Sequence, residues 1–111
     1  MPENAEYKLK VSLGLVWLRK NIYGAKVSVT ILDTCYVADD LKIGLPPGTV
    51  GVPEIEYLTF SFTRKDGPCG QIVQTVDKTI EIPFSTAKPK VTAFAVVNGK
   101  VAGQDTKPFP K

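Results

Sequence analysis

The clearest feature of the chain is an alternation of apolar and polar residues over positions 58 to 63. Large apolar residues occupy every second position there, and small hydroxyl residues stand between them; the apolar ones are Leu58, Phe60 and Phe62. A two-residue period is typical of a strand that buries one face. A turn-forming sequence, KDGP at 65–68, ends the run. We therefore predict a central strand at 55–64 whose apolar side lies in the core.

The same period predicts two strands before this one. Residues 7 to 18 begin with alternation and become apolar on both sides from Leu13, which predicts a strand covered on both faces in its second half. Gly14 stands where the pattern changes and indicates a bulge or a bend. A turn is expected at Tyr23-Gly24, and a second regular strand follows at 25–32. The residues from 33 to 40 show no clear period and are expected to be irregular.

Shorter strands are predicted after the central one, at 72–76, 78–84 and 91–97. Pro83 lacks an N–H group, so its strand is expected at or near a sheet edge. Apolar residues occupy both odd and even positions in 91–97, which indicates that both faces of this strand are covered. Asn98-Gly99 predicts a tight hairpin with a type I′ turn, and the returning strand starts at 101.

This pattern describes one all-β domain of six to seven strands, which we predict to be a β-sandwich at 7–105. A polar tail at 1–6 precedes it, and a proline-rich tail at 106–111 follows it. Residues 41 to 53 contain closely spaced prolines and glycines and form the longest predicted connection.

The series from Tyr57 to Gly103 resembles the second half of an immunoglobulin-like or fibronectin type III-like sandwich. The strand at 55–64 corresponds to the central C-like strand, 72–76 to a C′-like strand, 78–84 to an E-like strand, and the Asn98-Gly99 hairpin to the F–G hairpin. The resemblance implies an immunoglobulin-like architecture and no particular function, since such folds carry many functions. A small jelly roll or a Greek-key barrel is the alternative fold.

Composition places the chain among ordinary soluble domains. It has 111 residues, 43% of them hydrophobic, and a formal net charge of +3 spread along the sequence. The first six residues have no apolar segment typical of a signal peptide, and no apolar stretch approaches the ~20 residues of a membrane helix. We expect a protein made in the cytoplasm that does not enter a membrane.

The absence of histidine is the strongest restriction on chemistry. With no His in the sequence, Ser-His-Asp and Cys-His catalytic units and the common His-bearing zinc sites are excluded. We predict that the protein is not an enzyme and uses no cofactor or metal; a carboxylate- or thiol-based enzyme is the weaker alternative. Asp33, Asp39 and Asp40 do not have the spacing of an EF-hand calcium loop.

The two cysteines are predicted to be free thiols. Cys35 follows the second predicted strand and Cys69 follows the central strand, so counting the predicted strands places them at opposite ends of the sandwich. A ten-residue strand spans roughly 30 Å, whereas a disulfide needs Cα atoms within about 7 Å. Free thiols would agree with a reducing compartment.

Two kinds of surface were compared for binding. Tyr57, Phe60 and Phe62 beside Arg64 and Lys65 could stack on single-stranded nucleic acid. Phe60 and Phe62 share the apolar face of their strand, however, so we do not expect nucleic acid as the partner. The candidate interaction residues therefore lie on proline-stiffened segments: Leu45, Val50, Val52 and Phe109. The alternative is that these segments fold back over their own sandwich and cover sheet edges.

These observations favour a non-enzymatic structural or interaction protein. We expect a subunit or decoration of a larger homo- or hetero-oligomeric assembly, with other protein subunits as partners; a bacteriophage virion is one such assembly. The alternative is a free-standing binding module for a protein, a glycan or single-stranded nucleic acid.

Overall fold

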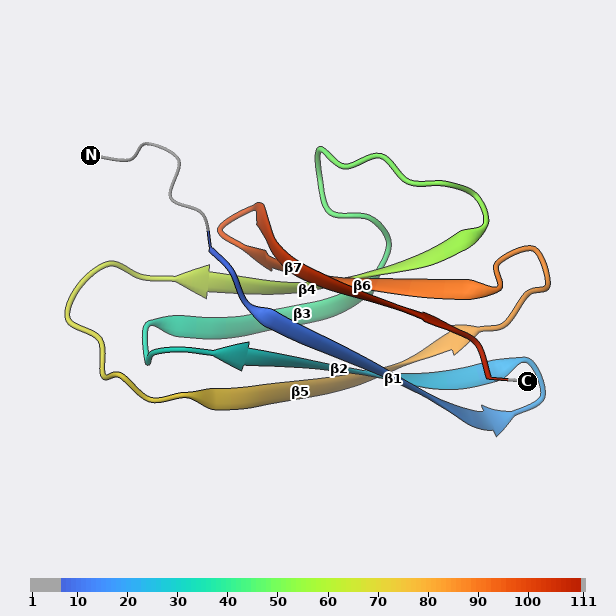
Figure 1. Cartoon of the computed structure of the whole chain (residues 1–111), viewed down its shortest axis with the longest axis horizontal. Helices are drawn as coiled ribbons and strands as arrows, with labels where there is room; N and C mark the ends of the chain where they lie inside the picture. Colours follow the sequence, from blue (N-terminus) through green and yellow to red (C-terminus); the bar gives the residue numbers. More distant parts are fainter. Residues whose placement is uncertain (1–6, 111) are drawn as a thin grey trace.

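The computed structural model describes residues 7 to 110, and their regular secondary structure is entirely β-strand (Figure 1). The seven strands are β1 Lys10–Arg19, β2 Ile22–Ile31, β3 Tyr36–Ile43, β4 Ile55–Arg64, β5 Gln74–Pro83, β6 Lys90–Val97 and β7 Lys100–Pro108. The predicted all-β sandwich is therefore confirmed. The predicted tail at 1–6 and the last residue lie outside the described residues.

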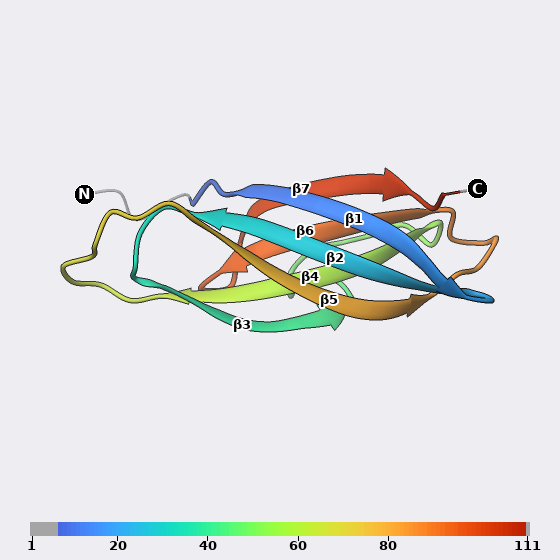
Figure 2. The same cartoon turned by 90° about the horizontal axis from the view of Figure 1, so that it is seen from below.

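The strands form two facing sheets in a body of 47 × 26 × 17 Å (Figures 1 and 2). One sheet has the order β1-β2-β5, and the other has the order β3-β4-β6-β7. Every pairing is antiparallel except that of β4 with β6, which is parallel. An immunoglobulin sandwich contains antiparallel sheets, so the resemblance holds for the layers and not for this central pair. Parallel neighbours need a long crossover, and β5 in the opposite sheet supplies it.

The core lies between the sheets and is centred on the strand that the sequence predicted. Leu58, Phe60 and Phe62 are fully or almost fully buried, and they pack against apolar residues of the opposite sheet such as Val27 and Ile82. The Phe60 and Phe62 rings are 4.5 Å apart. Burying these large side chains is the main source of stability in such a fold.

The two long sides of the sandwich are closed in different ways. On one side β1 meets β7: Leu9 N–H donates to the carbonyl of Ala102 at 2.9 Å, and Leu13 N–H donates to the Asp105 carboxylate at 2.8 Å. On the other side Lys78 of β5 reaches across to β3, where its ammonium group donates to the Asp39 carbonyl at 2.5 Å and lies 6.0 Å from the centre of the Phe60 ring. A lysine stem thus covers the edge of the core.

Several predicted details are confirmed. Asn98 and Gly99 have positive φ angles of 49° and 82°, as the hairpin between β6 and β7 requires. Pro83 ends β5, which is an edge strand. The inward-facing residues of β6 are buried, and the outward-facing Thr92 and Val96 are buried too. Both faces of this strand are therefore covered.

Other predicted details are wrong. Residues 36 to 43 form β3 instead of an irregular segment, and β5 is one strand from Gln74 instead of two short ones. The first turn lies at Lys20-Asn21, where Asn21 has a φ of 61°. Gly14 pairs regularly with Lys26, and the irregularity of β1 lies between Trp17 and Arg19. The predicted tail begins inside β7, because residues 106 to 108 still pair with β6.

The second half of β1 is not covered on both faces as predicted. Val16 and Trp17 are each 61% exposed, and Leu18 is also exposed. The reason is the position of β1 at the edge of the three-stranded sheet, where its second half diverges from β7 (Figure 2). An apolar run therefore reaches the surface here instead of the core.

Candidate functional site

The loop between β3 and β4, residues 44 to 54, is held in place by hydrogen bonds at its base and within it. At the base, Gly44 N–H donates to the Tyr57 carbonyl at 2.7 Å, and the Thr59 hydroxyl donates to the Gly44 carbonyl at 2.8 Å. Within the loop, the Thr49 hydroxyl donates to the Pro46 carbonyl at 2.6 Å. These bonds and the prolines restrict the conformations that the loop can adopt.

The far side of the loop is fixed by Tyr57. Val52 N–H donates to the Tyr57 hydroxyl at 2.9 Å, and the Tyr57 ring stacks on Phe94 of β6 with a centroid distance of 6.0 Å. A Cβ atom at Gly51 would overlap the Tyr57 ring, so only glycine allows this close approach. The loop is therefore attached to the outer face of the four-stranded sheet.

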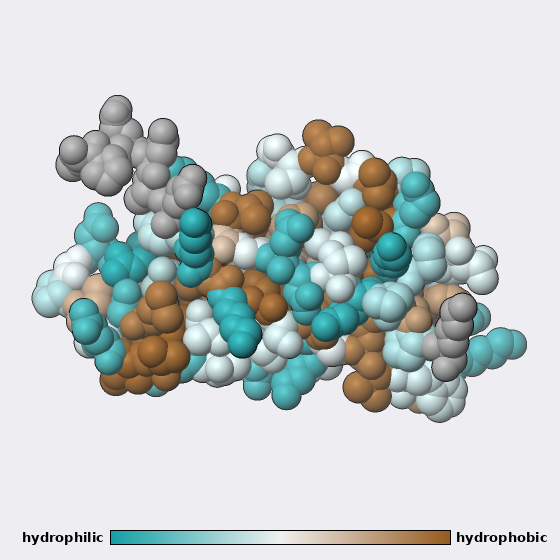
Figure 3. All heavy atoms as spheres, in the orientation of Figure 1, coloured by the Kyte–Doolittle hydropathy of each residue, from teal (hydrophilic) through white to brown (hydrophobic). Residues whose placement is uncertain are grey.

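The three loop residues predicted as interaction residues all reach the surface. Val50 is 96% exposed, and Val52 and Leu45 are exposed to a smaller extent. Apolar spheres project from the top of the molecule over this loop in Figure 3. A groove of about 300 Å³ lies beside the loop on the outer face of β3 and β4; its lining residues are Lys42, Ile43, Gly44, Leu45, Pro47, Thr59 and Ser61.

Phe109, the fourth predicted interaction residue, does not project from the surface. Its side chain is only 6% exposed, and its ring lies 5.0 Å from those of Tyr23 and Phe84. The Tyr23 hydroxyl also donates to the Pro110 carbonyl at 3.0 Å. The segment after β7 therefore folds back over its own sandwich, which was the alternative considered for it. The prolines on either side of Phe109 were the reason for predicting that it is exposed. In the structure, this proline-flanked segment crosses the end of the core.

A pocket lies beside this aromatic cluster. Its volume is about 400 Å³, and its lining residues are Tyr23, Phe84, Pro89, Lys90, Pro108, Phe109 and Pro110. The lining is mostly apolar with one cationic side chain, and the volume falls in the range of small-molecule and peptide sites.

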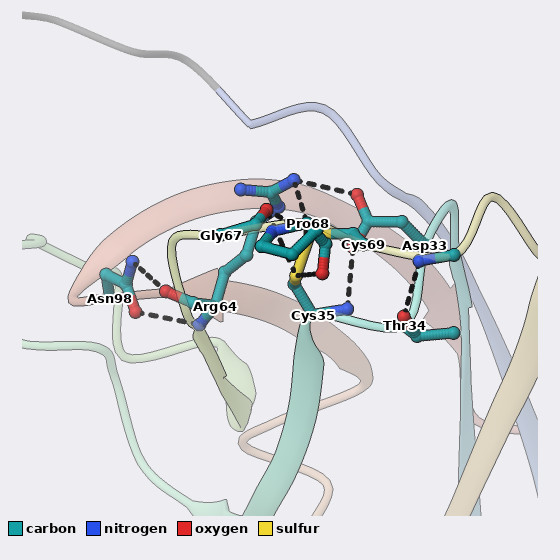
Figure 4. Close-up of polar contacts among 9 residues, drawn as sticks. Asp33, Thr34, Cys35, Arg64, Gly67, Pro68, Cys69 and Asn98 are labelled. Carbon is teal, nitrogen blue, oxygen red and sulfur yellow. Dashed lines mark hydrogen bonds and ion pairs between the residues drawn. A yellow bond between two sulfur atoms is a disulfide. The ribbon is translucent and has the colours of Figure 1, made fainter.

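The two cysteines form a disulfide, which contradicts the prediction of free thiols (Figure 4). Their Cα atoms are 5.4 Å apart. The prediction failed because β3 was not recognised: with β3 present, β2 and β4 run in the same direction, and the segments that follow them lie at the same end of the sandwich. The expected absence of a disulfide was one reason for predicting a reducing compartment and a virion, and this reason no longer holds.

Polar contacts surround the disulfide (Figure 4). Asp33 accepts Cys35 N–H at 2.9 Å and the Arg64 guanidinium at 2.9 Å. Asn98, at the tip of the β6–β7 hairpin, exchanges two hydrogen bonds with the backbone of Arg64. Thr34 and Gly70 also exchange two bonds. The turn after β2, the end of β4 and the hairpin tip are thus joined at one corner.

The electrostatics of this corner follow from these contacts. The hydrogen bond from Arg64 holds the pKa of Asp33 below its ordinary value of 3.8, against the opposing effect of burial. The same bond raises the pKa of Arg64, whose guanidinium lies 5.4 Å from the centre of the Tyr36 ring. Burial raises the pKa of Tyr36. Asp33 thus forms an ion pair with Arg64 that stabilises the corner. Asp39, another residue of the candidate calcium group, accepts a hydrogen bond from the Thr63 hydroxyl.

The aromatic residues considered for nucleic-acid stacking do not form a surface. Phe60 and Phe62 are buried between the sheets, while Tyr57 points to the outer face, where it is engaged with the loop and with Phe94. These rings cannot offer adjacent stacking faces to bases.

Two apolar surfaces were missed by the sequence interpretation. One is the exposed run at the end of β1, and the other is formed by Leu32, Ile72 and Val73, where β2 ends and β5 begins (lower left in Figure 3). Each is an apolar run next to a turn; the sequence predicted coverage on both faces for the run in β1, and only strand structure for the residues of the second surface. A continuous apolar run is the usual pattern of a fully buried strand, so the local sequence contains no signal that these runs reach the surface.

Comparison of the chain with protein-family models, with curated proteins and with solved structures finds no match. Between residues 7 and 110 there is no helix with the length and apolar character that crossing a membrane would require.

Proposed function

We propose that this protein is a non-enzymatic contact module that binds a partner protein through the loop at 44–54, as a subunit or decoration of a larger assembly. The observation that carries the proposal is Val50, which is 96% exposed at the surface of a hydrogen-bonded, proline-containing loop. An apolar side chain in a restricted loop loses little conformational entropy when it docks. The groove beside the loop gives a partner side chain a place to enter.

The chemistry of the chain supports contact in preference to catalysis. The sequence contains no histidine, and the shifted pKa values of Asp33, Tyr36 and Arg64 belong to a corner that fastens the disulfide-linked turns. The Cys35–Cys69 disulfide removes one reason for expecting a virion in particular, namely a sandwich without disulfides. The disulfide favours folding in an oxidising environment.

Size-exclusion chromatography of a native extract tests the proposal. The wild-type protein is expected to elute with a large complex, and Val50→Asp is expected to elute near the 12.1 kDa of the free chain, since a carboxylate would be buried without a partner. Val73→Asp is the matched control, because Val73 is 69% exposed in a loop at another corner. The proposal would be wrong if the wild type elutes as the free chain, or if Val50→Asp remains in the complex.

A free-standing binding module is the second candidate, and the pocket beside Phe109 favours it. Titrating ¹⁵N-labelled protein with short peptides and with monosaccharides tests this candidate. Chemical-shift changes confined to the pocket residues would support it, and unchanged spectra with every probe would count against it.

A further inference from the structure

The second half of β1 presents an unpaired backbone edge. Leu9 and Leu13 donate their N–H groups to Ala102 and Asp105 of β7, so the odd-numbered residues of β1 turn their N–H and C=O groups away from β2. Leu15 and Trp17 continue this direction. In Figure 2 the two strands diverge toward the C-terminal end of β1, and no backbone partner for the outward groups of Leu15 and Trp17 occurs within residues 7 to 110.

The other sheet edges carry features that discourage further pairing. Lys78 of β5 is a charged residue at an inward position, and Pro83 ends that strand. β3 has an irregular register at Asp39-Asp40, and β7 ends at Pro108. Charges, prolines and bulges are the usual protection of edge strands. Between Gly14 and Leu18, β1 has no charge and no proline, and its irregularity lies only at the end of this segment.

We propose that β1 pairs with β1 of a second copy of the chain, antiparallel about a twofold axis at Val16. In this register Leu15 of one copy lies opposite Trp17 of the other, so the outward groups of both residues are satisfied by four backbone hydrogen bonds. The three-stranded sheets of the two copies then form one continuous sheet.

The side chains fit this register. Val16 meets Val16 of the second copy at the axis. Leu18, whose side chain lies beside Gly24 of its own copy, stands opposite Gly14 of the second copy, where no atom lies within 4 Å of the position that a Cβ would take. The Trp17 side chain, now 61% exposed, would cover Leu15 of the second copy. The same register brings Arg19, which forms an ion pair with Glu81 of its own copy, toward Asp105 of the second copy, so opposite charges lie at the two ends of the contact.

The contact involves about five residues of each copy, which is smaller than the interface of an obligate dimer. The dimer is therefore reversible and forms as the protein concentration rises. It lies on the sheet opposite to the loop at 44–54 and does not depend on the partner of that loop.

Sedimentation velocity combined with Trp17 fluorescence tests the proposal, because Trp17 is the single tryptophan of the chain. With increasing concentration, the mass is expected to rise from 12.1 kDa to twice this value and no further, and the emission to shift to shorter wavelength in parallel. Val16→Lys and Val16→Glu are each expected to weaken the dimer by about tenfold or more, because like charges meet at the axis. A mixture of the two variants is expected to dimerise again.

This rescue by mixing is specific to a residue on the axis. Val101→Lys, at an exposed position of β7, is the control and is expected to dimerise as the wild type does. A wild type that stays at 12.1 kDa at every concentration, growth beyond a dimer, or dimers unaffected by the Val16 variants would each overturn the proposal.

Discussion

Removal of the Cys35–Cys69 disulfide is expected to destabilise the protein strongly. The bridge joins residues 34 positions apart, and in the chain-entropy model a closed loop of this length lowers the entropy of the unfolded chain by an amount worth about 3.8 kcal/mol at 25 °C. The bridge also holds the corner where Asp33 pairs with Arg64. A domain of this size has a total stability of about 5–15 kcal/mol, so the loss is a large part of it.

The effect can be measured by thermal and urea unfolding of three samples: the oxidised wild type, the wild type with a reductant, and the double variant Cys35→Ser with Cys69→Ser. The unfolding entropy of a domain is about 2.1 cal/mol/K per residue, so for this chain the double variant is expected to unfold about 16 °C below the oxidised wild type. Reductant should bring the wild type close to the double variant and should leave the double variant unchanged.

Two results would refute this reasoning. Labelling of two thiols in the native wild type without reductant would show that the bridge does not form. A double variant that unfolds within a few degrees of the oxidised wild type would show that closing this loop does not constrain the unfolded chain as the entropy model requires.

Three further predictions concern the core, the closed edge and the corner. Phe60→Ala should lower the free energy of unfolding by about 3–5 kcal/mol in urea titrations, and a loss below 1 kcal/mol would contradict its central place in the core. Gly103→Ala should lower the free energy of unfolding by about 1–3 kcal/mol, because the added Cβ would overlap the Leu9 carbonyl oxygen. Gly14→Ala is the control; its Cβ would meet no atom, so this variant should lower the free energy of unfolding far less. The lowered pKa of Asp33 means that its contribution to stability is present above its ordinary value of 3.8 and is lost as pH falls through the native value. The stability difference between wild type and Asp33→Asn should therefore shrink on acidification, and a difference that stays constant to low pH would argue against the ion pair.

The strands that could be predicted from the sequence are those with an undisturbed two-residue period. β4 and most of β2 place their apolar residues regularly toward the core, and Asn98-Gly99 specifies its hairpin through local backbone preference alone. β5 was divided in two because Lys78 occupies an inward position at a sheet edge. A lysine can occupy this inward position only because β3 of the opposite sheet provides a hydrogen-bond acceptor for it. The local sequence does not reveal that partner.

The missed strand β3 had the largest consequence. Its irregular register at Asp39-Asp40 shifts the period in the middle of the strand, so neither half shows enough alternation. Overlooking one strand reversed the assumed direction of β4, and this reversal separated Cys35 from Cys69 in the prediction. Exposure of the loop at 44–54 was predictable from its prolines and glycines, whereas the burial of Phe109 depends on Tyr23 and Phe84, which are distant in sequence.

The parallel pair at the centre of the four-stranded sheet also affects how the chain can fold. Ile55 pairs with Lys90, and Leu58 pairs with Ala93, so partners along this seam are 35 positions apart. The antiparallel pairs β3–β4 and β6–β7 can each form between strands that are consecutive in the sequence. Pairing of β4 with β6 can form only after the chain has crossed through β5, and closing this long loop loses chain entropy. During synthesis, a ribosome that has not yet released β6 leaves β4 with an open, strongly apolar edge. Unpaired strand edges favour pairing between chains, so we expect aggregation of the growing chain in that interval.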